Sequence, residues 1–409
     1  MDNENKVKED MRFTIQDICE KIGPRAPCSE QEAACATYIE NCFKNYTEDS
    51  RIENFYCHPG SYRAAFRIPM IDLIIATISY WIYFFYPNIV SLLISFGFII
   101  FSVIVIQTNL MRNIEFIDPL FKKQKSTNVY GKFKPRETTE QIIVIGGHHD
   151  SNWEFPILKK WPKFYMGFMS IPVILSFVMV AVYILKIILY FVSIPFLFVQ
   201  QVDLGLLILQ TTLFPILIYT IIKCVSKDSV MGADDNLTSI AIMLELAKFL
   251  KKPNGLKNTE VWLVSHGCEE IGDRGSKRFS KKNLSELRNA YVINIDMVGG
   301  KDSELKVDVV EVRSIVKLSK ELGDELSIIA TELHIPHTVG NVMFYTDSMA
   351  YSNNGIKACS LVGSPKKGFA THYHTLNDTI DKLDFNNLWN CYRILIEFIK
   401  KVDQKKILI

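Results

Sequence analysis

Two long apolar blocks constrain the fold of this 409-residue chain more than any other feature. The first occupies residues 69–110 and carries no charged side chain between Asp72 and Arg112. The second occupies residues 164–224 and is interrupted by Lys186. About 20 apolar residues are enough for a helix to cross the ~30 Å of hydrocarbon in a bilayer. Each block is therefore too long for a buried core helix and long enough for a membrane hairpin.

The turn signals inside the blocks suggest how many spans there are. Tyr86-Pro87-Asn88 divides the first block into spans at about 70–86 and 88–109. In the second block the first and last pieces read as spans. The middle piece is short and contains Pro195, so it could extend the first helix, lie at the interface or re-enter. Both blocks leave from and return to the same folded domain, which requires an even number of crossings, and we expect four spans as two hairpins.

The charges that flank the blocks predict the orientation of the chain. Lysine and arginine residues cluster outside both blocks, whereas the turns inside the hairpins hold at most Lys186. The positive-inside rule then places the rest of the chain on the cytoplasmic side. The charged start, MDNENKVKEDMRF, lacks the apolar region of a cleavable signal peptide. Free thiols are accordingly favoured over disulfides for the nine cysteines.

The remaining 300 or so residues have the pattern of one α/β domain, and they come from residues 1–68, 111–163 and 225–409. Short β-branched runs alternate with helical patterns, as in sheets covered by helices. The expected strands are 141–146, 260–266, 290–297 and 357–363, preceded by a strand at NVYGKF. The expected helices are 29–44, 236–252, 274–287, 311–332 and 384–402. A net charge of +2 without a basic stripe gives no reason to expect a nucleic-acid partner.

Polar side chains gather where these strands end, which is the edge of an open α/β sheet that usually binds ligands. In the stretch GGHHDS, His148 and Asp150 are two residues apart and point the same way in an extended strand. A metal-binding imidazole usually donates its second N–H to a carboxylate. The pattern therefore predicts His148 as a metal ligand, Asp150 as the residue that orients it, and His149 on the opposite face.

Three further stretches offer metal ligands, although each has an ordinary explanation when taken alone. Asp and Asn in GADDN (232–236) could be simple helix N-caps. Glu269 and Glu270 follow a strand, and adjacent glutamates can divide the work of metal ligand and unbound general base. Asp296 ends a buried strand, where an unpaired charge would be costly without a cation. His374, in the stretch THYHT, could be a surface residue.

Taken in order, the motifs HxDS, GADDN, EEIGxxGS, NxDMVG and HTxxDTxDKL resemble the di-zinc exopeptidases of the aminopeptidase Y, bacterial leucyl aminopeptidase and glutamate carboxypeptidase type. The opening, ICEKIGPRAPCSEQEAACATYI (18–39), is similar to the N-terminal helix of that family, which often carries GPR. The resemblance covers everything except the two apolar blocks. It implies a mixed-sheet α/β domain with helices on both faces, here interrupted by two transmembrane helical hairpins.

The resemblance also implies two Zn²⁺ ions and a role for each matched residue. Asp235 would bridge the zincs, with His148 and Asp296 on the first and Glu270 and His374 on the second. Glu269 would be the general base that acts on the water bridging the two zincs. The stretch YTDSMAYSNNGIKA is similar to a family segment whose tyrosine steadies the oxyanion, so Tyr345 is a catalytic candidate. That segment usually carries histidine where this chain has Ser348.

Several functions remain open at this point. The first is a membrane-embedded, zinc-dependent aminopeptidase or dipeptidase-like exopeptidase, whose partners are a peptide substrate and the lipid bilayer. The second is a glutaminyl cyclase, although that branch commonly uses one zinc and lacks the GADDN form of the turn. The third is an amide hydrolase for a lipidic substrate, because block two leaves the chain between ligands His148 and Asp235. A scaffold without activity is disfavoured because every ligand position is filled, and simple anchoring stays open for the hairpins.

Overall fold

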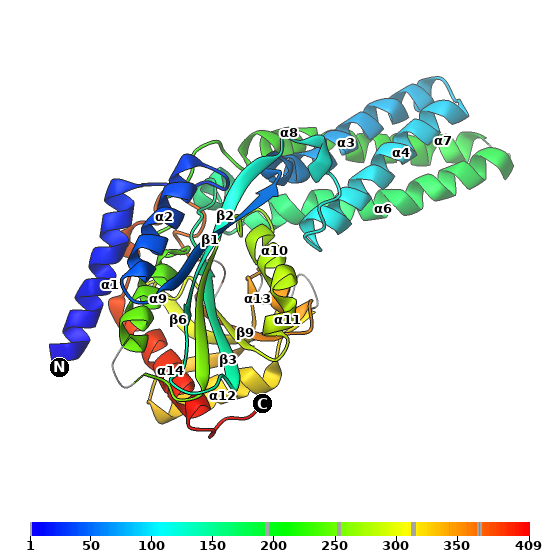
Figure 1. Ribbon diagram of the computed structural model, residues 1–409. Coiled ribbons are helices and arrows are strands. Elements are labelled where there is room, and N and C mark those ends of the chain that lie inside the picture. Colours follow the sequence, from blue (N-terminus) through cyan, green and yellow to red (C-terminus); the bar gives the residue numbers. More distant parts are fainter. Residues whose placement is uncertain are drawn as a thin grey trace. The chain divides into compact units, whose positions relative to one another are not determined.

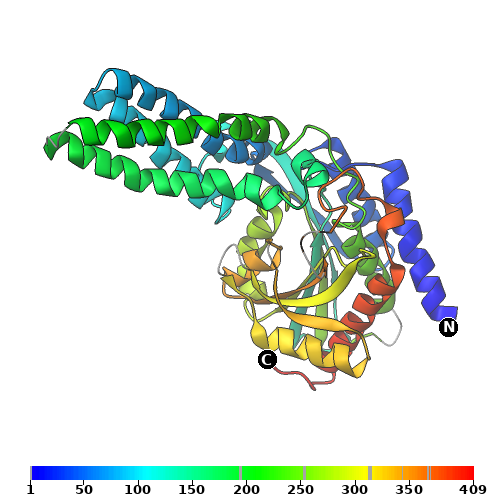
Figure 2. The same cartoon turned by 180° about the vertical axis from the view of Figure 1, so that it is seen from behind.

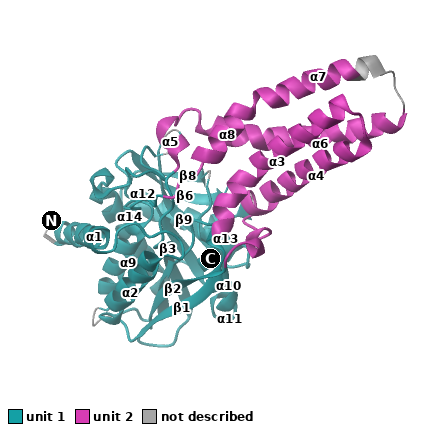
Figure 3. Cartoon of the chain, turned by 90° about the horizontal axis from the view of Figure 1, so that it is seen from above, with its two compact units in different colours: residues 1–59, 123–154, 228–409 teal, residues 60–122, 155–227 magenta. Residues whose placement is uncertain are grey.

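The chain forms two compact units, coloured separately in Figure 3. The computed structural model describes residues 2–409 except 193–195, 252–254, 312–315, 343, 366–367 and 369. Unit 1 comprises Met1–Pro59, Lys123–Glu154 and Asp228–Ile409, and unit 2 comprises Gly60–Lys122 and Phe155–Lys227. Unit 2 thus contains both apolar blocks together with their flanking residues.

Unit 1 is built around a mixed sheet that has nine strands within the described residues (Figure 1). Their order is β1-β2-β4-β3-β5-β9-β6-β7, with β8 beside β6. The central strands β4, β3, β5 and β9 are parallel, and β1, β2 and β6 are antiparallel to their neighbours nearer the centre. The bounds are β1 Asp49–Cys57, β2 Gln124–Phe133, β3 Gln141–His148, β4 Thr259–His266, β5 Tyr291–Asp296, β6 Ser303–Glu311, β7 Val316–Lys317, β8 His337–Val342 and β9 Lys357–Pro365.

Helices cover both faces of this sheet (Figures 1 and 2). One face packs against α1 (Asp2–Lys21), α2 (Glu30–Lys44), α9 (Leu237–Leu250), α12 (Lys320–Glu332) and α14 (Phe385–Asp403). The other packs against α10 (Arg274–Lys282), α11 (Leu284–Leu287) and α13 (Ser348–Ser352), and a short 3₁₀ turn lies at Ile380–Lys382. The α/β fold class expected from the sequence is confirmed.

The central strands read as apolar runs because both of their faces are buried. In β3, Ile143 and Ile145 belong to the core under α9 and α14, while Val144 belongs to the core under α10. Successive side chains of a strand point to opposite faces, so a strand covered on both sides needs apolar residues throughout. Since β3, β4 and β5 are parallel, their carboxyl ends meet at one edge of the sheet.

One helix prediction was too long. The expected helix 311–332 contains the end of β6 at Glu311, the short strand β7 and only then α12. Ser319 is the residue that sets the start of α12, because its hydroxyl accepts a hydrogen bond from the N–H of Leu322 at 3.3 Å. An N-cap of this kind ends the extended backbone that precedes it. Strands β1, β6 and β8 were absent from the sequence-based prediction.

Unit 2 is helical within the described residues. Its bounds are α3 Pro59–Phe85, α4 Ile89–Val105, α5 Pro156–Lys160, α6 Tyr165–Val192, α7 Phe196–Thr212 and α8 Phe214–Lys223, with a π turn at Ile106–Leu110 and a 3₁₀ turn at Asp118–Leu120. Four helical segments are long and apolar enough to cross a membrane: Pro59–Phe85, Ile89–Leu110, Tyr165–Val192 and Gln200–Lys223. Asn88 caps α4 by accepting the N–H of Ser91, which explains the break at Tyr86-Pro87-Asn88.

The middle piece of the second block (187–203) is divided between two helices, since α6 continues through Lys186 to Val192 and α7 begins at Phe196. Pro195 lies outside the described residues. Lys186 is buried and pairs with Asp203 of α7 at 2.5 and 2.7 Å, and the hydroxyl of Tyr80 on α3 donates to the same carboxylate. A charge among apolar helices is tolerated when it is paired in this way. The hydrogen bond from Tyr80 therefore ties the first apolar block to the second inside unit 2.

Candidate metal centre

The three central strands deliver the predicted ligands to one edge of the sheet. His148 is the last residue of β3, Asp296 is the last residue of β5, and Glu269 and Glu270 lie in the loop after β4. Asp235 lies in the turn before α9, where the next residue, Asn236, caps the helix by accepting the N–H of Ser239. The peptide bond between Asp235 and Asn236 is cis.

His374 completes the set from a turn that follows β9. Its backbone has a positive φ of 49°, a conformation that few non-glycine residues adopt. The imidazole stacks on the ring of Tyr373, with centroids 3.8 Å apart. All five predicted ligands are buried, and they fall into overlapping groups whose potential ligand atoms lie within 4.8 Å of one another.

Asp235 stands between two histidines. Its Oδ1 lies 3.2 Å from Nε2 of His148, and its Oδ2 lies 3.1 Å from Nε2 of His374. Each carboxylate oxygen therefore belongs to a different candidate metal group, one formed with His148 and Asp296 and the other with Glu270 and His374. One carboxylate that faces two ligand sets is the arrangement that a bridging ligand requires.

The other carboxylates fall to either side of Asp235. Asp296 Oδ1 lies 3.9 Å from His148 Nε2, and Glu270 Oε2 lies 3.1 Å from His374 Nε2. Glu269 Oε2 lies 3.7 Å from His148 Nε2. Glu269 forms a third candidate group with His148 and Glu270, but it is in neither of the two groups that share Asp235. Each of the two groups that share Asp235 thus has three members, and Glu269 is the carboxylate beside His148 that neither of them includes.

The site has the properties of a centre for divalent cations. Imidazole nitrogens and carboxylate oxygens form the donor set, which suits Zn²⁺. Two buried oxygens, Glu270 Oε1 and Asp296 Oδ1, have no hydrogen-bond partner among the described residues. A buried carboxylate oxygen without a partner is costly unless a cation meets it. The residues present therefore fit zinc, and the two groups that share Asp235 are candidate positions for it.

The electrostatics of the protein alone point the same way. Burial raises the pKa of Glu270 to about 7 and that of Asp296 to about 6, and it raises the pKa of Glu269 well above its usual value. Burial lowers the pKa of His374, but the negative charges of Glu270 and Asp235 outweigh it and raise that pKa to about 9. Raised pKa values of the carboxyl groups, together with the raised pKa of His374, show that the site gathers more negative charge than the protein alone neutralises. Cations would relieve it.

Asp150 connects the two halves of the constellation. Nδ1 of His148 lies 3.1 Å from the backbone carbonyl of Asp150 and 3.5 Å from its Oδ1. The same carboxylate accepts hydrogen bonds from the backbone N–H groups of Glu269, at 3.1 Å, and Glu270, at 3.2 Å. The hydrogen bond to the His148 ring thus comes from the backbone carbonyl of Asp150 and not from the carboxylate that the spacing indicates, so the orienting role of Asp150 stays a prediction. The carboxylate fixes the loop after β4.

His149 turns away from the candidate ligands. Its Nδ1 lies 2.8 Å from the hydroxyl of Ser265, and the ring is fully buried. Burial lowers the pKa of His149 to about 3, so the imidazole is neutral. This is the opposite-face placement that the alternation of the strand predicts.

A second layer of polar residues supports Asp235, and the sequence motifs had not identified its roles. Asp378 accepts the backbone N–H groups of Asp234 and Asp235 at 2.8 and 3.2 Å. The carboxylate of Asp234 in turn accepts the N–H of Gly299 at 2.8 Å and lies 2.8 Å from Nε2 of His372. Asp234 therefore points away from the ligand cluster and anchors the turn. The motif GADDN offers two aspartates, and these contacts give the one that the family resemblance left without a role a place in the support of the turn.

Asn152 and Arg25 are further supporting residues. The amide of Asn152 donates to Glu270 Oε2 at 2.6 Å. The buried guanidinium of Arg25 donates to the carbonyls of His149, Met231 and Gly232 at 2.7, 2.9 and 3.0 Å. Arg25 thus ties the end of β3 to the turn that carries Asp235. Its signal in the sequence is the GPR of the opening segment.

Tyr345 lies between β8 and α13 and is half-buried. Its proposed role at the oxyanion stays a prediction. Ser348, at the position where the similar family segment usually has histidine, is buried at the start of α13 and donates to the carbonyl of Cys359 at 2.8 Å.

Comparison with known proteins agrees with this geometry. The model of peptidase family M28 matches residues 220–399. Aminopeptidase YwaD of Bacillus subtilis (strain 168) is 29% identical over 168 residues, which are 38% of this chain and 34% of that protein. The chain therefore matches about a third of the length of this curated relative.

Solved structures share the fold across the whole chain. BSAP, a zinc aminopeptidase from Bacillus subtilis, has a TM-score of 0.58 at 14% identity, with 97% of this chain and 95% of that chain covered. A glutaminyl cyclase from Bacteroides thetaiotaomicron has a TM-score of 0.55 at 13% identity, with 96% and 97% covered. The resemblance to zinc exopeptidases that the five motifs indicate is confirmed, and the metallopeptidase class of hydrolase is supported.

Proposed function

We propose that this chain, a relative of peptidase family M28, is a zinc-dependent aminopeptidase that hydrolyses N-terminal peptide bonds. The observation that carries the proposal is Asp235, whose two oxygens face His148 and His374, while Glu269 lies outside the two candidate groups that share Asp235. A hydrolase of this kind needs two filled metal positions and one free carboxylate beside them. The two groups that share Asp235 would provide the metal positions, and Glu269 would provide the carboxylate.

The residues divide the chemistry between them. His148, Asp235 and Asp296 would hold one Zn²⁺, and Asp235, Glu270 and His374 would hold the other. The ions would polarise the scissile carbonyl and lower the pKa of the attacking water. Glu269 would take the proton of that water on Oε2 and return it to the nitrogen of the departing amine. Burial raises the pKa of Glu269 well above its usual value.

A second candidate is the glutaminyl cyclase reaction, because solved structures with this fold include glutaminyl cyclases. That reaction consumes the N-terminal amine of a glutaminyl substrate, whereas an aminopeptidase releases the first residue. The intact GADDN turn, with Asp235 between two histidines, favours the aminopeptidase.

A third candidate is hydrolysis of a lipidic amide. It is favoured by one feature of the chain, namely that the second apolar block lies between His148 and Asp235 in the sequence. An amide that partitions into the bilayer would then be delivered to a hydrolase anchored there. A soluble peptide needs no such connection.

The substrate class is tested with purified full-length protein in detergent. Leucyl p-nitroanilide and a free-amine dipeptide should be hydrolysed, and the same dipeptide with an acetylated N-terminus should not. Conversion of glutaminyl peptides to pyroglutamyl products without release of the first residue would overturn the proposal in favour of the cyclase. Preference for N-acyl amino-acid lipids over free-amine peptides would overturn it in favour of the lipid amidase.

We further propose that the four apolar helical segments cross a membrane as two hairpins, with unit 1 on the cytoplasmic side. The flanking lysine and arginine residues support this orientation. Single cysteines at Asn88 in the turn of the first hairpin and at the exposed Lys281 of unit 1 would test it in a cysteine-poor background. A membrane-impermeant maleimide applied to intact cells should label the first site only. Labelling of the second site would contradict the orientation.

A further inference from the structure

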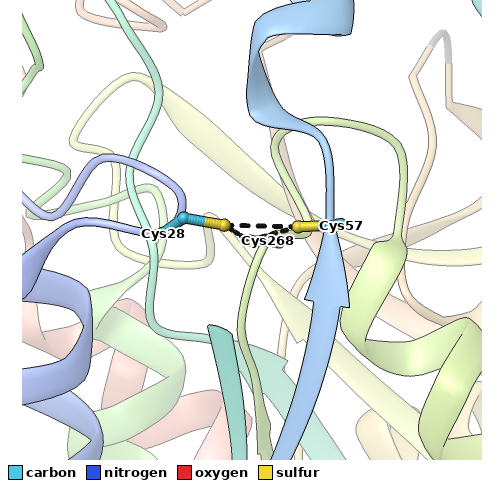
Figure 4. Close-up of side chains that lie close together, drawn as sticks. All are labelled: Cys28, Cys57 and Cys268. Carbon is cyan, nitrogen blue, oxygen red and sulfur yellow. Dashed lines mark hydrogen bonds between the residues drawn. The ribbon is translucent and has the colours of Figure 1, made fainter. Parts of the chain in front are cut away.

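Unit 1 contains a second cluster of possible metal ligands that the proposed hydrolase does not use. The thiols of Cys28, Cys57 and Cys268 point toward one another from three segments far apart in the sequence (Figure 4). The Sγ atoms of Cys28 and Cys57 lie 3.3 Å apart, and each lies 3.5 Å from Sγ of Cys268. Three sulfur atoms thus form a nearly equilateral triangle.

The three cysteines sit on well-fixed elements. Cys57 is the last residue of β1, Cys28 lies in the turn before α2, and Cys268 lies in the loop after β4. Cys57 and Cys268 are fully buried, while Cys28 is partly exposed. Cys28 and Cys268 both have positive φ angles, 62° and 55°, which non-glycine residues rarely adopt. The backbone on both sides is therefore bent in the way that turns these two thiols inward.

One buried carboxylate holds both of these turns. Glu32 accepts the backbone N–H of Cys28 on Oε2 at 2.8 Å and that of Cys268 on Oε1 at 2.9 Å. Oε1 also accepts the hydroxyl of Ser126 at 2.9 Å and lies 3.3 Å from Sγ of Cys268. A carboxylate that positions two ligand-bearing turns resembles the outer-shell partners of metal ligands.

Hydrogen bonding alone is a weak reason for such a cluster, because thiols are poor donors and poor acceptors. A disulfide would use two of the three sulfur atoms and leave the third without a role. A thiophilic cation uses all three. With Zn–S bonds of about 2.3 Å in tetrahedral geometry, sulfur atoms are about 3.8 Å apart, so an outward shift of about 0.4 Å per pair would suffice.

We propose that Cys28, Cys57 and Cys268 form a structural zinc site, separate from the candidate metal centre, with the carboxylate of Glu32 beside it. The site would cross-link the turn before α2, the end of β1 and the loop after β4. Cys268 directly precedes Glu269 and Glu270, so a bound ion would hold the segment that carries the proposed base.

Cobalt substitution tests this site independently of catalysis. The proposed ligands of the catalytic centre are histidine, aspartate and glutamate, so only the cysteine cluster can give a thiolate-to-Co²⁺ charge-transfer band in the near ultraviolet. Full-length protein reconstituted with Co²⁺ should show this band. The double variant Cys28→Ser/Cys57→Ser should lose it and bind one zinc fewer per chain. Cys42→Ser, a half-buried thiol on α2, is the matched control and should keep both.

Two results would overturn the proposal. One is the absence of the band in folded protein whose three thiols are all reduced. The other is a Cys–Cys disulfide within the cluster, seen as a mass two units below that of the reduced chain in protein prepared without reductant. Asp235→Asn should leave the band unchanged, so failure of the proposed hydrolase and failure of this site can be told apart.

Discussion

The carboxylate of Asp150 accepts the backbone N–H of Glu269 at 3.1 Å, although 118 residues and the whole second apolar block separate the two in the chain. Through this bond and the one from Glu270, the residue predicted to orient His148 also fixes the loop of the proposed base. Because these contacts join two halves of the site, Asp150 should matter for turnover even though it is not a proposed ligand.

Asp150→Asn is expected to lower kcat by about 10- to 100-fold, the usual cost of losing an outer-shell partner of a metal ligand. The amide that replaces one carboxylate oxygen is a donor and would face the N–H of Glu269 or Glu270. Steady-state hydrolysis of leucyl p-nitroanilide measures the effect. Asp302→Asn, at an exposed position, is the control and should keep full activity. Wild-type kcat in Asp150→Asn would rule out this role.

Asp235→Asn and Asp296→Asn make the same chemical change at two carboxylates that differ in their predicted role. Asp235 faces both histidines, so replacing its carboxylate by an amide should weaken both metal positions. Asp296 faces His148 and belongs to one of the two groups that share Asp235. Zinc per chain after dialysis should fall toward zero for Asp235→Asn and toward one for Asp296→Asn, apart from any zinc held elsewhere. If Asp235→Asn loses no more zinc than Asp296→Asn, then Asp235 is not a bridge.

Arg25→Lys should destabilise unit 1 without touching a ligand. The guanidinium satisfies three buried carbonyls, of His149, Met231 and Gly232, and a lysine ammonium cannot reach all of them. A lost bond to a charged donor costs about 1.5–3 kcal/mol, and the unfolding free energy should drop by at least that amount. Thermal unfolding in detergent measures it, with exposed Arg288→Lys as the control. Equal stability of the two variants would show that the hydrogen bonds of Arg25 do not stabilise unit 1.

Removing one partner of the Lys186–Asp203 ion pair should destabilise unit 2, and removing both partners should restore most of its stability. Asp203→Asn leaves the buried ammonium of Lys186 without its counter-ion, and breaking a buried pair in this way costs about 3–5 kcal/mol. Lys186→Met/Asp203→Leu removes both charges and should recover most of the loss. The yield of monodisperse protein in mild detergent, together with its thermal midpoint, reports on both variants. A double variant as defective as the single one would show that the charges are needed for something other than pairing.

The sequence alone predicted the parts of this molecule that depend on local pattern. The buried runs at 141–146 and 260–266 became β3 and β4 because parallel strands covered on both faces must be apolar throughout. The alternation in GGHHDS separated His148 from His149, and the structure places them on opposite sides. The turn at Tyr86-Pro87-Asn88 separated two helices because Asn88 caps the second one.

What could not be predicted depends on contacts between distant segments. The family resemblance singles out Asp235 in GADDN, but it gives no role to Asp234, whose bonds to Gly299 and His372 appear only in the structure. The cluster of Cys28, Cys57 and Cys268 carries no local spacing signal, since it arises where three separate segments meet. The helix predicted from residue 311 was wrong in its first part. The apolar spacing there also suits a strand, and the N-cap at Ser319 sets the start of α12.

The central claim is that two zinc ions are held by this site while Glu269 stays free to move the proton. Glu269→Gln keeps the shape of the side chain and removes its basicity, so zinc content and kcat should be measured on the same preparation. The expected result is the wild-type number of zinc ions per chain, with kcat lowered by about 10²- to 10⁴-fold. Wild-type kcat in this variant, or loss of zinc in parallel with activity, would contradict the assignment of Glu269 as the base.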